Sequence, residues 1–304
     1  MMNIAKRTAM DPYDALLRAG EIAATVREDA LSLIEPGRKI IEICDFVHKS
    51  ILEMGGKQAF PCNVDINEVA AHYTSPLHDE TELPDDSLVK LDIGVHVDGY
   101  IADTAVTVCF DSKYNSMVDA AKAALDAAIS NVRSGVNAGD IGAVIEKTIK
   151  RRGYQPIRNL TGHKMSRFIV HSGSSIPNIS QRRMQTLNTG DVYAIEPFTV
   201  PHNAAGVVID GAPSNIYLFK KKHRISGSLT KKMAKYIQSE FNTMPFASRW
   251  VLNKFPDGRE AFRELVQSRS VHSYPQLIEK SGMPVAQAEH TIIVTEEGCL
   301  VTTS

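Results

Sequence analysis

The sequence predicts an α+β fold built from two similar halves, each with two helices followed by strands, and interrupted by an inserted helical segment. Two helix pairs recur about one hundred positions apart, and each pair is interrupted at a glycine. Apolar strands follow each pair, and the first two meet at Asp98-Gly99, a strong hairpin-turn signal. The composition, with 43% hydrophobic and 23% charged residues and a net charge of −1, is typical of a globular protein with ample core.

The first helix pair has clear boundaries. Asp11-Pro12 starts a helix that continues from Tyr13 to the stop at Glu35-Pro36-Gly37, because Asp caps a helix well and Pro suits its first turn. A second helix is predicted over residues 38–54 and ends at Gly55-Gly56. The chain therefore opens with two successive helices.

The second pair, predicted over residues 115–133 and 140–152, repeats the first at an offset of 98 positions. His72 likewise precedes His171 by 99 positions, and Asp92 precedes Glu196 by 104, each at the end of an apolar or small-residue stretch. Helix-glycine-helix units are common, so one favourable offset is weak evidence by itself. The matching histidines and carboxylates favour a duplicated half-domain.

Two aspartates occupy strands that are otherwise apolar, predicted over residues 88–95 and 100–110. These are Asp92 in the first strand and Asp103 in the second. Burying a carboxylate costs several kcal/mol unless a cation or hydrogen-bond donors compensate it. Pairing with Lys or Arg is the simpler explanation for one such residue, but two on neighbouring strands indicate a bound metal.

The sequence pattern changes to helical periodicity after Phe219, which indicates an inserted helical subdomain over residues 219–275. Residues 1–218 and 276–304 are then expected to form the main domain. The segment opens with a basic run at residues 220–224, and its helical periodicity is broken by prolines. It also contains five aromatic residues that we expect to form a small core of its own: Phe241, Phe246, Trp250, Phe255 and Phe262. A strand is predicted to resume at residues 288–294.

Several classes of protein are not expected. No run of eighteen apolar residues could span a membrane, and the N-terminal residues lack the apolar core of a signal peptide. Cys44, Cys62, Cys109 and Cys299 are widely spaced and fit reduced thiols. We therefore expect a cytoplasmic monomer with no DNA or membrane partner. The basic run at residues 220–224 is expected to be a solvated face, and contact with ribosomal RNA is the alternative.

Five positions have the chemistry of a divalent-metal site: Asp92, Asp103, His163, Glu196 and Glu289. Four carboxylates and one imidazole form an oxygen-rich set that suits Mn, Fe, Co or Zn, and carboxylates can bridge two cations that promote hydrolysis. Their spacing alone is weak evidence, since an ion pair would explain Glu196 and a loop position would explain His163. The repetition of carboxylates in apolar strands is the stronger observation.

His72 and His171 are flanked by small or apolar residues. A lone histidine in such surroundings is more often a core residue with satisfied hydrogen bonds. Because these two occupy matching places in the two halves, we expect them to share a cavity.

A set of sequence stretches places these residues in a familiar order: Phe60-Pro61-Cys62-Asn63 with Ala71-His72-Tyr73; Lys90-Leu91-Asp92-Ile93-Gly94 through Asp103; Asn159-Leu160-Thr161-Gly162-His163 with His171-Ser172-Gly173; Tyr193-Ala194-Ile195-Glu196-Pro197-Phe198; and Glu289-His290-Thr291-Ile292. They resemble the pita-bread metallopeptidases, and most closely the type 2 methionine aminopeptidases in the short form usual in archaea. The helical insertion points to type 2. The resemblance implies a pita-bread fold, in which pseudo-twofold halves surround a curved antiparallel sheet.

The resemblance also implies that the chain holds two divalent metal ions. Asp92 would chelate one ion, Asp103 and Glu289 would bridge both, and His163 with Glu196 would complete the other. The substrates would be nascent polypeptide N-termini, because a free α-amine can bind a metal and an internal peptide has none.

Catalytic roles follow from the same resemblance. Glu196 would move the proton of the attacking water, His171 would stabilise the oxyanion, and His72 would position or protonate the group around the scissile amide. His72 and His171 would also contact the substrate, together with four residues that match the methionine pocket: Phe60, Val170, Phe198 and Tyr274. A small second residue is expected. Several type 2 enzymes have a pocket histidine where residues 214–217 stand here without one.

Two alternatives remain open. A proline-specific aminopeptidase or dipeptidase of the same fold would share all five ligands, although such enzymes usually carry a substantial N-terminal domain before the residue that matches Phe60. A non-catalytic relative that binds RNA or protein is the other, although such relatives lose ligands and this sequence keeps all five.

Overall fold

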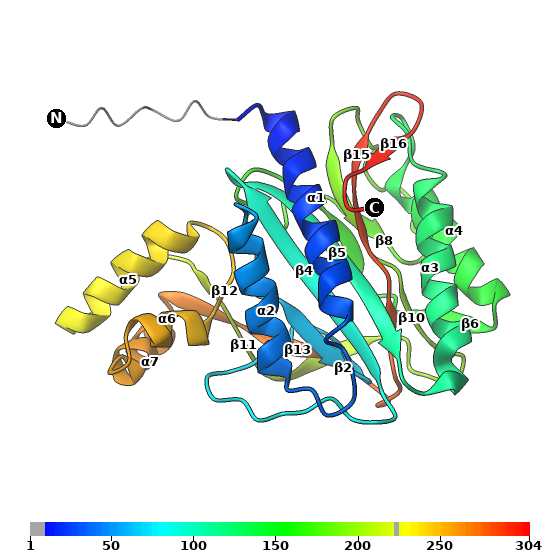
Figure 1. The fold of residues 1–304 in the computed structure, drawn as a ribbon. Coiled ribbons are helices and arrows are strands. Elements are labelled where there is room, and N and C mark those ends of the chain that lie inside the picture. The colour runs from blue at the N-terminus through cyan, green and yellow to red at the C-terminus, as the bar shows by residue number, and fades with distance from the viewer. Residues whose placement is uncertain (1–9, 222–224) are drawn as a thin grey trace.

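Both predicted helix pairs are present in the computed structural model, which describes residues 10–221 and 225–304 (Figure 1). The four helices are α1 (Pro12–Leu31), α2 (Ile40–Glu53), α3 (Asn115–Ile129) and α4 (Ala138–Arg151). Asp11 caps α1 as predicted, since its side chain accepts a hydrogen bond from the Tyr13 N–H at 2.9 Å. α1 and α3 end before the predicted positions 35 and 133, because short turns lead from each helix to the glycine that follows it.

The strands pair in antiparallel fashion throughout the described residues. Their bounds are β1 (Lys57–Gln58), β2 (Asn63–Ile66), β3 (Val69–Ala71), β4 (Leu88–Val97), β5 (Tyr100–Cys109), β6 (Tyr154–Pro156), β7 (Thr161–Met165), β8 (Ser175–Pro177), β9 (Val192–Ile195), β10 (Phe198–Pro201), β11 (Val208–Phe219), β12 (Phe246–Ala247), β13 (Val271–Glu279), β14 (Ala286–Gln287), β15 (His290–Val294) and β16 (Cys299–Val301). They form sheets of order β1-β4-β2 with β5 on β4, β14-β10-β6, β12-β11-β13-β3 and β16-β15-β9-β7-β8. A short 3-10 helix, η1 (Ser112–Tyr114), follows β5.

The duplication predicted from the sequence is confirmed by backbone contacts that recur in both halves. Three contacts of the first half have a counterpart in the second. The Gly37 N–H donates to Leu83 O as the Gly135 N–H donates to Leu187 O, and the Leu83 N–H donates to Arg38 O as the Leu187 N–H donates to Val136 O. The backbone bridge between Lys39 and Glu82 likewise matches the bridge between Asn137 and Thr186. Residues 37–39 and 135–137 of these contacts differ by 98 positions, and residues 82–83 and 186–187 differ by 104, the offsets seen in the sequence. Each half therefore joins the residues before its second helix to the segment that precedes β4 or β9 in the same way.

The predicted hairpin is also confirmed. Asp98 and Gly99 both have positive φ angles, 51° and 89°, so they form the type I′ turn that matches strand twist. β4 alternates between two environments: Val89 and Leu91 pack with the apolar side chains of α1 and α2, while Asp92 faces the other side. In Figure 1, α1 and α2 accordingly cover one face of the hairpin.

The inserted segment contains three helices, α5 (Ser228–Phe241), α6 (Ser248–Lys254) and α7 (Arg259–Gln267). The aromatic residues expected to form its core do pack together: Phe246 and Phe262 are buried, and Phe241, Trp250 and Phe255 pack against them. Residues 271–275, expected to be helical, instead begin β13, because this stretch pairs with β11.

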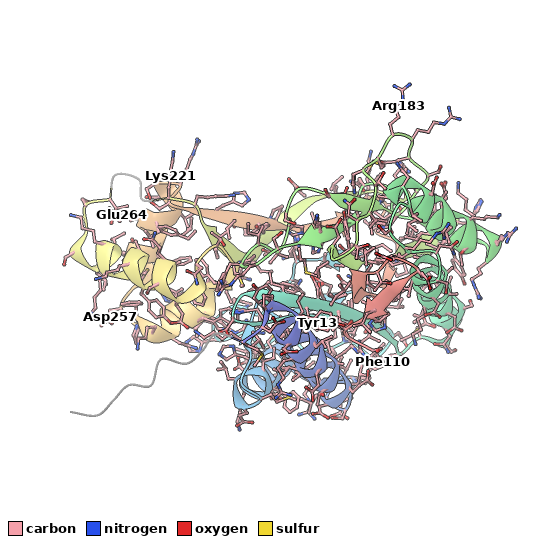
Figure 2. All side chains as sticks on the ribbon, turned by 90° about the horizontal axis from the view of Figure 1, so that it is seen from above. Tyr13, Phe110, Arg183, Lys221, Asp257 and Glu264 are labelled. Carbon is pink, nitrogen blue, oxygen red and sulfur yellow. The ribbon has the colours of Figure 1, made fainter. Side chains whose placement is uncertain are left out.

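The basic run at residues 220–224 is only partly described. Lys220 and Lys221 are exposed, and residues 222–224 lie outside the described residues. Lys221 lies in the same part of the molecule as Glu264 and Asp257, away from Arg183 (Figure 2). Cys44, Cys62, Cys109 and Cys299, all within the described part of the chain, are free thiols, as predicted. None of the described helices is both long and apolar enough to cross a bilayer.

A close approach of α1 to the C-terminal residues gives a test of this packing. Gly20 lies so near Thr302 that an added Cβ would be 2.0 Å from the Thr302 carbonyl oxygen. Replacing glycine by alanine inside a helix ordinarily stabilises it by about 1 kcal/mol. We predict that Gly20→Ala instead lowers the free energy of unfolding by roughly 1–3 kcal/mol, as overpacking does.

Urea denaturation would measure this change. Thr25→Ala, at an exposed position of the same helix, is the matched control and should be neutral or slightly stabilising. Stabilisation by Gly20→Ala would contradict the described contact.

Candidate metal centre

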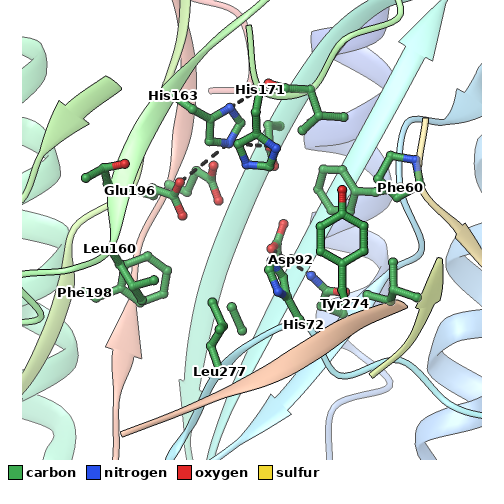
Figure 3. A pocket seen from close by; sticks show the side chains of 18 of the residues that line it. Phe60, His72, Asp92, Leu160, His163, His171, Glu196, Phe198, Tyr274 and Leu277 are labelled. Atoms are coloured by element: carbon green, nitrogen blue, oxygen red, sulfur yellow. Dashed lines mark hydrogen bonds and ion pairs between the residues drawn. The ribbon is translucent and has the colours of Figure 1, made fainter. Parts of the chain in front are cut away.

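A single cavity brings together every residue that the sequence nominated for the site (Figure 3). Its lining comprises Phe60, Asn63, Ala71, His72, Asp92, Asp103, Asn159, Leu160, Thr161, His163, Val170, His171, Glu196, Phe198, Ile216, Pro245, Tyr274, Leu277 and Glu289. These side chains come from both halves and from the inserted segment. The proximity of His72 and His171 that we predicted is therefore observed, since both line this cavity.

Strand register places Asp92 and Asp103 side by side. Asp92 pairs with Ala105 across the hairpin, and Asp103 pairs with Gly94, so the two carboxylates project from the same face on diagonal positions. Both are buried, with exposed fractions of 8% and 3%. Asn63 Nδ2 donates to Asp92 Oδ2 at 3.2 Å and orients that carboxylate.

His163 lies in β7 rather than in a loop, and its ring is oriented by the backbone. Its Nδ1 lies 2.8 Å from the Val170 carbonyl oxygen. A carbonyl can only accept, so Nδ1 carries the hydrogen and the Nε2 lone pair faces the cavity. Nε2 lies 3.5 Å from Asp103 Oδ2 and 3.6 Å from Glu196 Oε1. Glu196 itself follows the last residue of β9 directly, as predicted.

Glu289 reaches the cavity from just outside a strand, whereas we expected it inside one. β15 begins one residue later, and Glu289 forms an isolated backbone bridge with Ala105. This bridge connects the C-terminal sheet to the β4–β5 hairpin. Gln287 Nε2 donates to Glu289 Oε2 at 3.1 Å and lies 3.4 Å from Glu196 Oε2, so one amide orients two carboxylates.

Burial and mutual repulsion dominate the electrostatics of the cavity. Burial raises the pKa of Asp92 to about 7. Burial, followed by repulsion from neighbouring carboxylates, raises the pKa values of Asp103, Glu196 and Glu289 well above the usual range. Burial lowers the pKa of His163 to about 3, so its imidazole is neutral. A neutral imidazole among carboxylates provides electron-pair donors and no positive charge.

The residues present fit a divalent cation. Asp92 Oδ1 and Asp103 Oδ1 are buried acceptors without a hydrogen-bond partner. Ligand atoms of Asp103, His163 and Glu289 all lie within 4.8 Å of one another. Carboxylate oxygens and one imidazole nitrogen are donors that Mn²⁺, Fe²⁺, Co²⁺ and Zn²⁺ accept. An isolated set of carboxylates this deeply buried needs such a charge to compensate it.

His72 has an unusual backbone conformation beside the metal-binding residues. Its φ angle is 73°, which is uncommon outside glycine and concentrates at functional sites. Its Nδ1 donates to the Pro275 carbonyl at 3.3 Å, and its ring contacts Tyr274 edge-on at 5.6 Å between centroids. The His171 ring packs against the His163 ring at an angle of 49°, with 4.2 Å between ring centroids.

The apolar part of the cavity has two lobes, whereas we expected one pocket. Phe60 and Val170 belong to one buried cluster, and Phe198 belongs to another, packed with Leu160 and Leu277. Figure 3 shows Leu160 and Phe198 on one side of the cavity, opposite Phe60 and Tyr274. Phe198 begins β10, whereas Tyr274 lies in β13 of another sheet and Phe60 and Val170 lie in loops, so Phe198 approaches the cavity from a different part of the fold.

Several lining residues escaped the sequence analysis. Ile216 and Pro245 also line the cavity, and Ile216 stands in the stretch of residues 214–217 where a pocket histidine was expected and none occurs. No local pattern singles out either residue, since each reaches the cavity through long-range packing. Asn63 is the exception, because it follows directly in the Phe60-Pro61-Cys62 stretch that was noted.

The Phe60 ring rests directly on the strand that carries Asp92. A Cβ added to Gly94 would lie 2.2 Å from a ring carbon of Phe60. Gly94 is also the residue opposite Asp103 in the ladder. The lobe wall and the metal-binding strand are therefore in direct contact.

Comparison with known proteins supports a common ancestry over nearly the whole chain. Residues 14–296 match metallopeptidase family M24. The methionine aminopeptidase of Methanothermobacter thermautotrophicus is 47% identical over 295 residues, covering 95% of this chain and 98% of the relative. That of Methanocaldococcus jannaschii is 45% identical over 294 residues, covering 97% and 99%.

Solved structures share the fold at lower identity. A thermophilic Arx1 has a TM-score of 0.79 with 18% identity, covering 97% of this chain and 91% of that one. Methionine aminopeptidase from Rickettsia prowazekii has a TM-score of 0.69 with 20% identity, covering 98% and 99%. Prolidase from Pyrococcus furiosus has a TM-score of 0.63 with 16% identity, covering 96% and 64%. These likenesses support the pita-bread architecture predicted from the sequence.

The repulsion in the cavity predicts opposite effects of one substitution with and without metal. Asp103→Asn removes one of the crowded charges, so the metal-free protein should melt at a higher temperature than wild type at pH 7.5. Mn²⁺ at one hundred times its Kd should raise the free energy of unfolding of wild type by about 2.7 kcal/mol, and that of the variant by much less.

Thermal denaturation with EDTA and with Mn²⁺ would measure both changes. Asp65→Asn is the matched control, since Asp65 is fully buried but does not line the cavity. It should lower stability and leave the Mn²⁺ increment intact. An undiminished increment in Asp103→Asn would contradict the assignment of Asp103.

Proposed function

The chain belongs to metallopeptidase family M24, and on this premise we propose that it is a metalloaminopeptidase that removes the N-terminal methionine from nascent polypeptides. The convergence of four carboxylates and one neutral imidazole beside an apolar cavity carries the proposal. Relatives at 40–47% identity over nearly full length bear the name methionine aminopeptidase. We further propose that the inserted segment at residues 219–275 is the subdomain characteristic of type 2, beside a catalytic domain of residues 1–218 and 276–304.

Members of this family use divalent metal, and we propose two ions here, with Co, Mn, Fe and Zn as the candidates. The ions would be held by Asp92, Asp103, His163, Glu196 and Glu289, which bring carboxylate oxygens and one imidazole nitrogen into the cavity. Among these atoms, Asp92 Oδ1 and Asp103 Oδ1 are buried and lack a hydrogen-bond partner. Bound divalent ions supply Lewis acidity, which polarises a carbonyl and lowers the pKa of water.

Glu196 is the proton carrier of the proposed reaction. Its Oε1 faces His163 across the cavity, and Gln287 holds the other oxygen. It accepts a proton from the attacking water and returns it to the leaving amine, as a general base and then a general acid. Burial raises its pKa, which brings the carboxyl closer to the operating pH than an exposed glutamate.

The two remaining histidines orient the substrate peptide. Burial lowers the pKa of His72 to about 4, so its ring is neutral, and Nδ1 is occupied by the Pro275 carbonyl. Nε2 therefore accepts a hydrogen bond from the scissile amide, which favours the positioning role of His72 over the protonating role. His171 donates a hydrogen bond to the oxygen that becomes negative in the transition state.

The two lobes divide the substrate between them. The lobe formed by Phe60, Val170 and Tyr274, with Ile216 and Pro245, receives the methionine side chain, because a flexible thioether fills an irregular apolar pocket well. Phe198 belongs to the second lobe with Leu160 and Leu277, which crowds the residue after methionine and limits it to a small side chain.

The cytoplasmic location and the monomeric state remain predictions from the sequence, as does a solvated face at residues 220–224, with ribosome contact as its alternative.

Replacing the proton carrier tests the mechanism. We predict that Glu196→Gln lowers kcat for methionine release from Met-Ala-Ser by about 10²–10⁴-fold, the range for loss of a general base. The fold should persist, because glutamine has nearly the same shape. Circular dichroism and thermal unfolding would check the fold, and Glu297→Gln at an exposed turn is the control. Turnover within a few-fold of wild type would exclude this role for Glu196.

The second lobe predicts which residue controls the second substrate position. Leu277→Ala should raise kcat/KM for Met-Val-Ser relative to Met-Ala-Ser by roughly 10- to 200-fold, the value of one or more methylene groups in an apolar pocket. Leu300→Ala, at a residue outside the cavity, should leave the ratio unchanged.

The same assay separates the alternative functions. Faster hydrolysis of an Xaa-Pro dipeptide than of Met-Ala-Ser would favour a proline-specific peptidase. A protein that contains no metal by elemental analysis and stays inactive with added Mn²⁺ or Co²⁺ would favour a binding module.

A further inference from the structure

The Val170 loop (residues 166–170) orients one of the metal-binding side chains. The Val170 carbonyl oxygen accepts the hydrogen bond from His163 Nδ1, at 2.8 Å. This bond determines which ring nitrogen of His163 carries the hydrogen, and so which one can bind a cation. The position of one carbonyl in this loop therefore decides whether His163 Nε2 is available to the cavity.

The Val170 loop is held in a strained turn. Ser166 and Ile169 exchange backbone hydrogen bonds of 3.0 and 2.8 Å, which closes a two-residue turn. Phe168 occupies a position in this turn with a φ angle of 61°. Left-handed backbone is disfavoured for an aromatic residue, and it persists only where surrounding contacts impose it.

The turn of the β4–β5 hairpin supplies one set of these contacts. The Phe168 N–H donates to the Gly99 carbonyl at 2.8 Å, and Arg167 Nε donates to the Asp98 carbonyl at 2.8 Å. The Phe168 ring lies against Gly99, where an added Cβ would be 2.4 Å from a ring carbon. The hairpin that carries Asp92 therefore also holds the Val170 loop.

The inserted segment supplies the other contact. The exposed Thr243 hydroxyl donates to the Phe168 carbonyl oxygen. The next two residues of the inserted segment also lie near this loop or the cavity. Met244 is buried in the cluster that contains Val170, and Pro245 lines the cavity. One hydroxyl thus connects the inserted segment to the strained residue of the Val170 loop.

We propose that Thr243 is a positioning residue for His163. Its hydrogen bond helps to hold Phe168 in the left-handed conformation, which keeps the Val170 carbonyl on His163 Nδ1 and leaves Nε2 free for a cation. The inserted segment thereby acts on the metal centre as well as on the substrate lobe. This inference rests on the proposed function in one respect, since it takes the cavity to be the metal site.

Two substitutions at Thr243 separate the hydroxyl from the volume of the side chain. Thr243→Val keeps the shape and removes the donor, whereas Thr243→Ser keeps the donor. Mn²⁺ binding to metal-free protein would be measured by titration calorimetry. We expect Thr243→Val to raise Kd about 3- to 10-fold, the usual value of one hydrogen bond, and Thr243→Ser to stay within twofold of wild type. Equal affinities for Thr243→Val and wild type would overturn the proposal.

A glycine at position 168 tests the role of strain. Phe168→Gly adopts a positive φ without assistance, so adding Thr243→Val to it should change Kd by less than twofold. The full 3- to 10-fold loss in the double variant would show that Thr243 acts by another route.

Nitrogen-15 spectra of the imidazoles distinguish this proposal from the function it rests on. Wild type should show His163 with hydrogen on Nδ1, assigned by comparison with His163→Asn, and Thr243→Val should show a mixture of tautomers. An unchanged tautomer in Thr243→Val would overturn the positioning role. Failure of wild type to bind Mn²⁺, with the tautomer shift present, would instead contradict the metal centre and leave the positioning role standing.

Discussion

Four carboxylates crowded into one buried cavity repel one another, and the rest of the structure is arranged to withstand that repulsion. Attraction and repulsion between charges are strongest where the dielectric is low. The carboxylates are attached to or beside strands whose backbone hydrogen bonds hold them in place, including β4, β5 and β9. Amide groups of Asn63 and Gln287 orient three of them. The helices stay on the outer face of the hairpin, so the cavity side is free for polar chemistry.

The duplicated halves share a backbone arrangement but not a chemistry. In the second half His163 pairs across the sheet with Ala194, and the corresponding pair in the first half is Asp65 with Lys90. Lys90 is fully buried and donates to two backbone carbonyls, one of them that of Val285. In the first half, a buried ammonium group therefore lies near the buried Asp65 carboxylate and attracts it. The second half instead contributes an uncharged imidazole nitrogen at the matching position, beside the carboxylates that both halves supply to the cavity.

Local signals explain how much of this could be predicted from the sequence. Asp98-Gly99 encodes a turn that determines the register of Asp92 and Asp103, and the repeated glycines encode the duplication. Phe198 lines the predicted cavity but packs in a different cluster from Phe60 and Val170, which no local pattern indicates because its sheet partners are remote in sequence, at residues 154–156 and 286–287. The strained φ angle of Phe168 carries no sequence signal, since aromatic residues rarely adopt it. Prediction succeeded where short-range patterns decide the geometry, and it failed where distant strands meet.

The contact between Phe60 and Gly94 restricts how the specificity of this enzyme could be redesigned. The ring of Phe60 has no clearance above the strand, and the same backbone position faces Asp103 across the ladder. A bulkier side chain at position 94 would push the aromatic wall away only by moving the strand that carries Asp92. Changes to the cavity lining should therefore start from Ile216 and Pro245, which lie outside the β4–β5 hairpin and can change without displacing that strand.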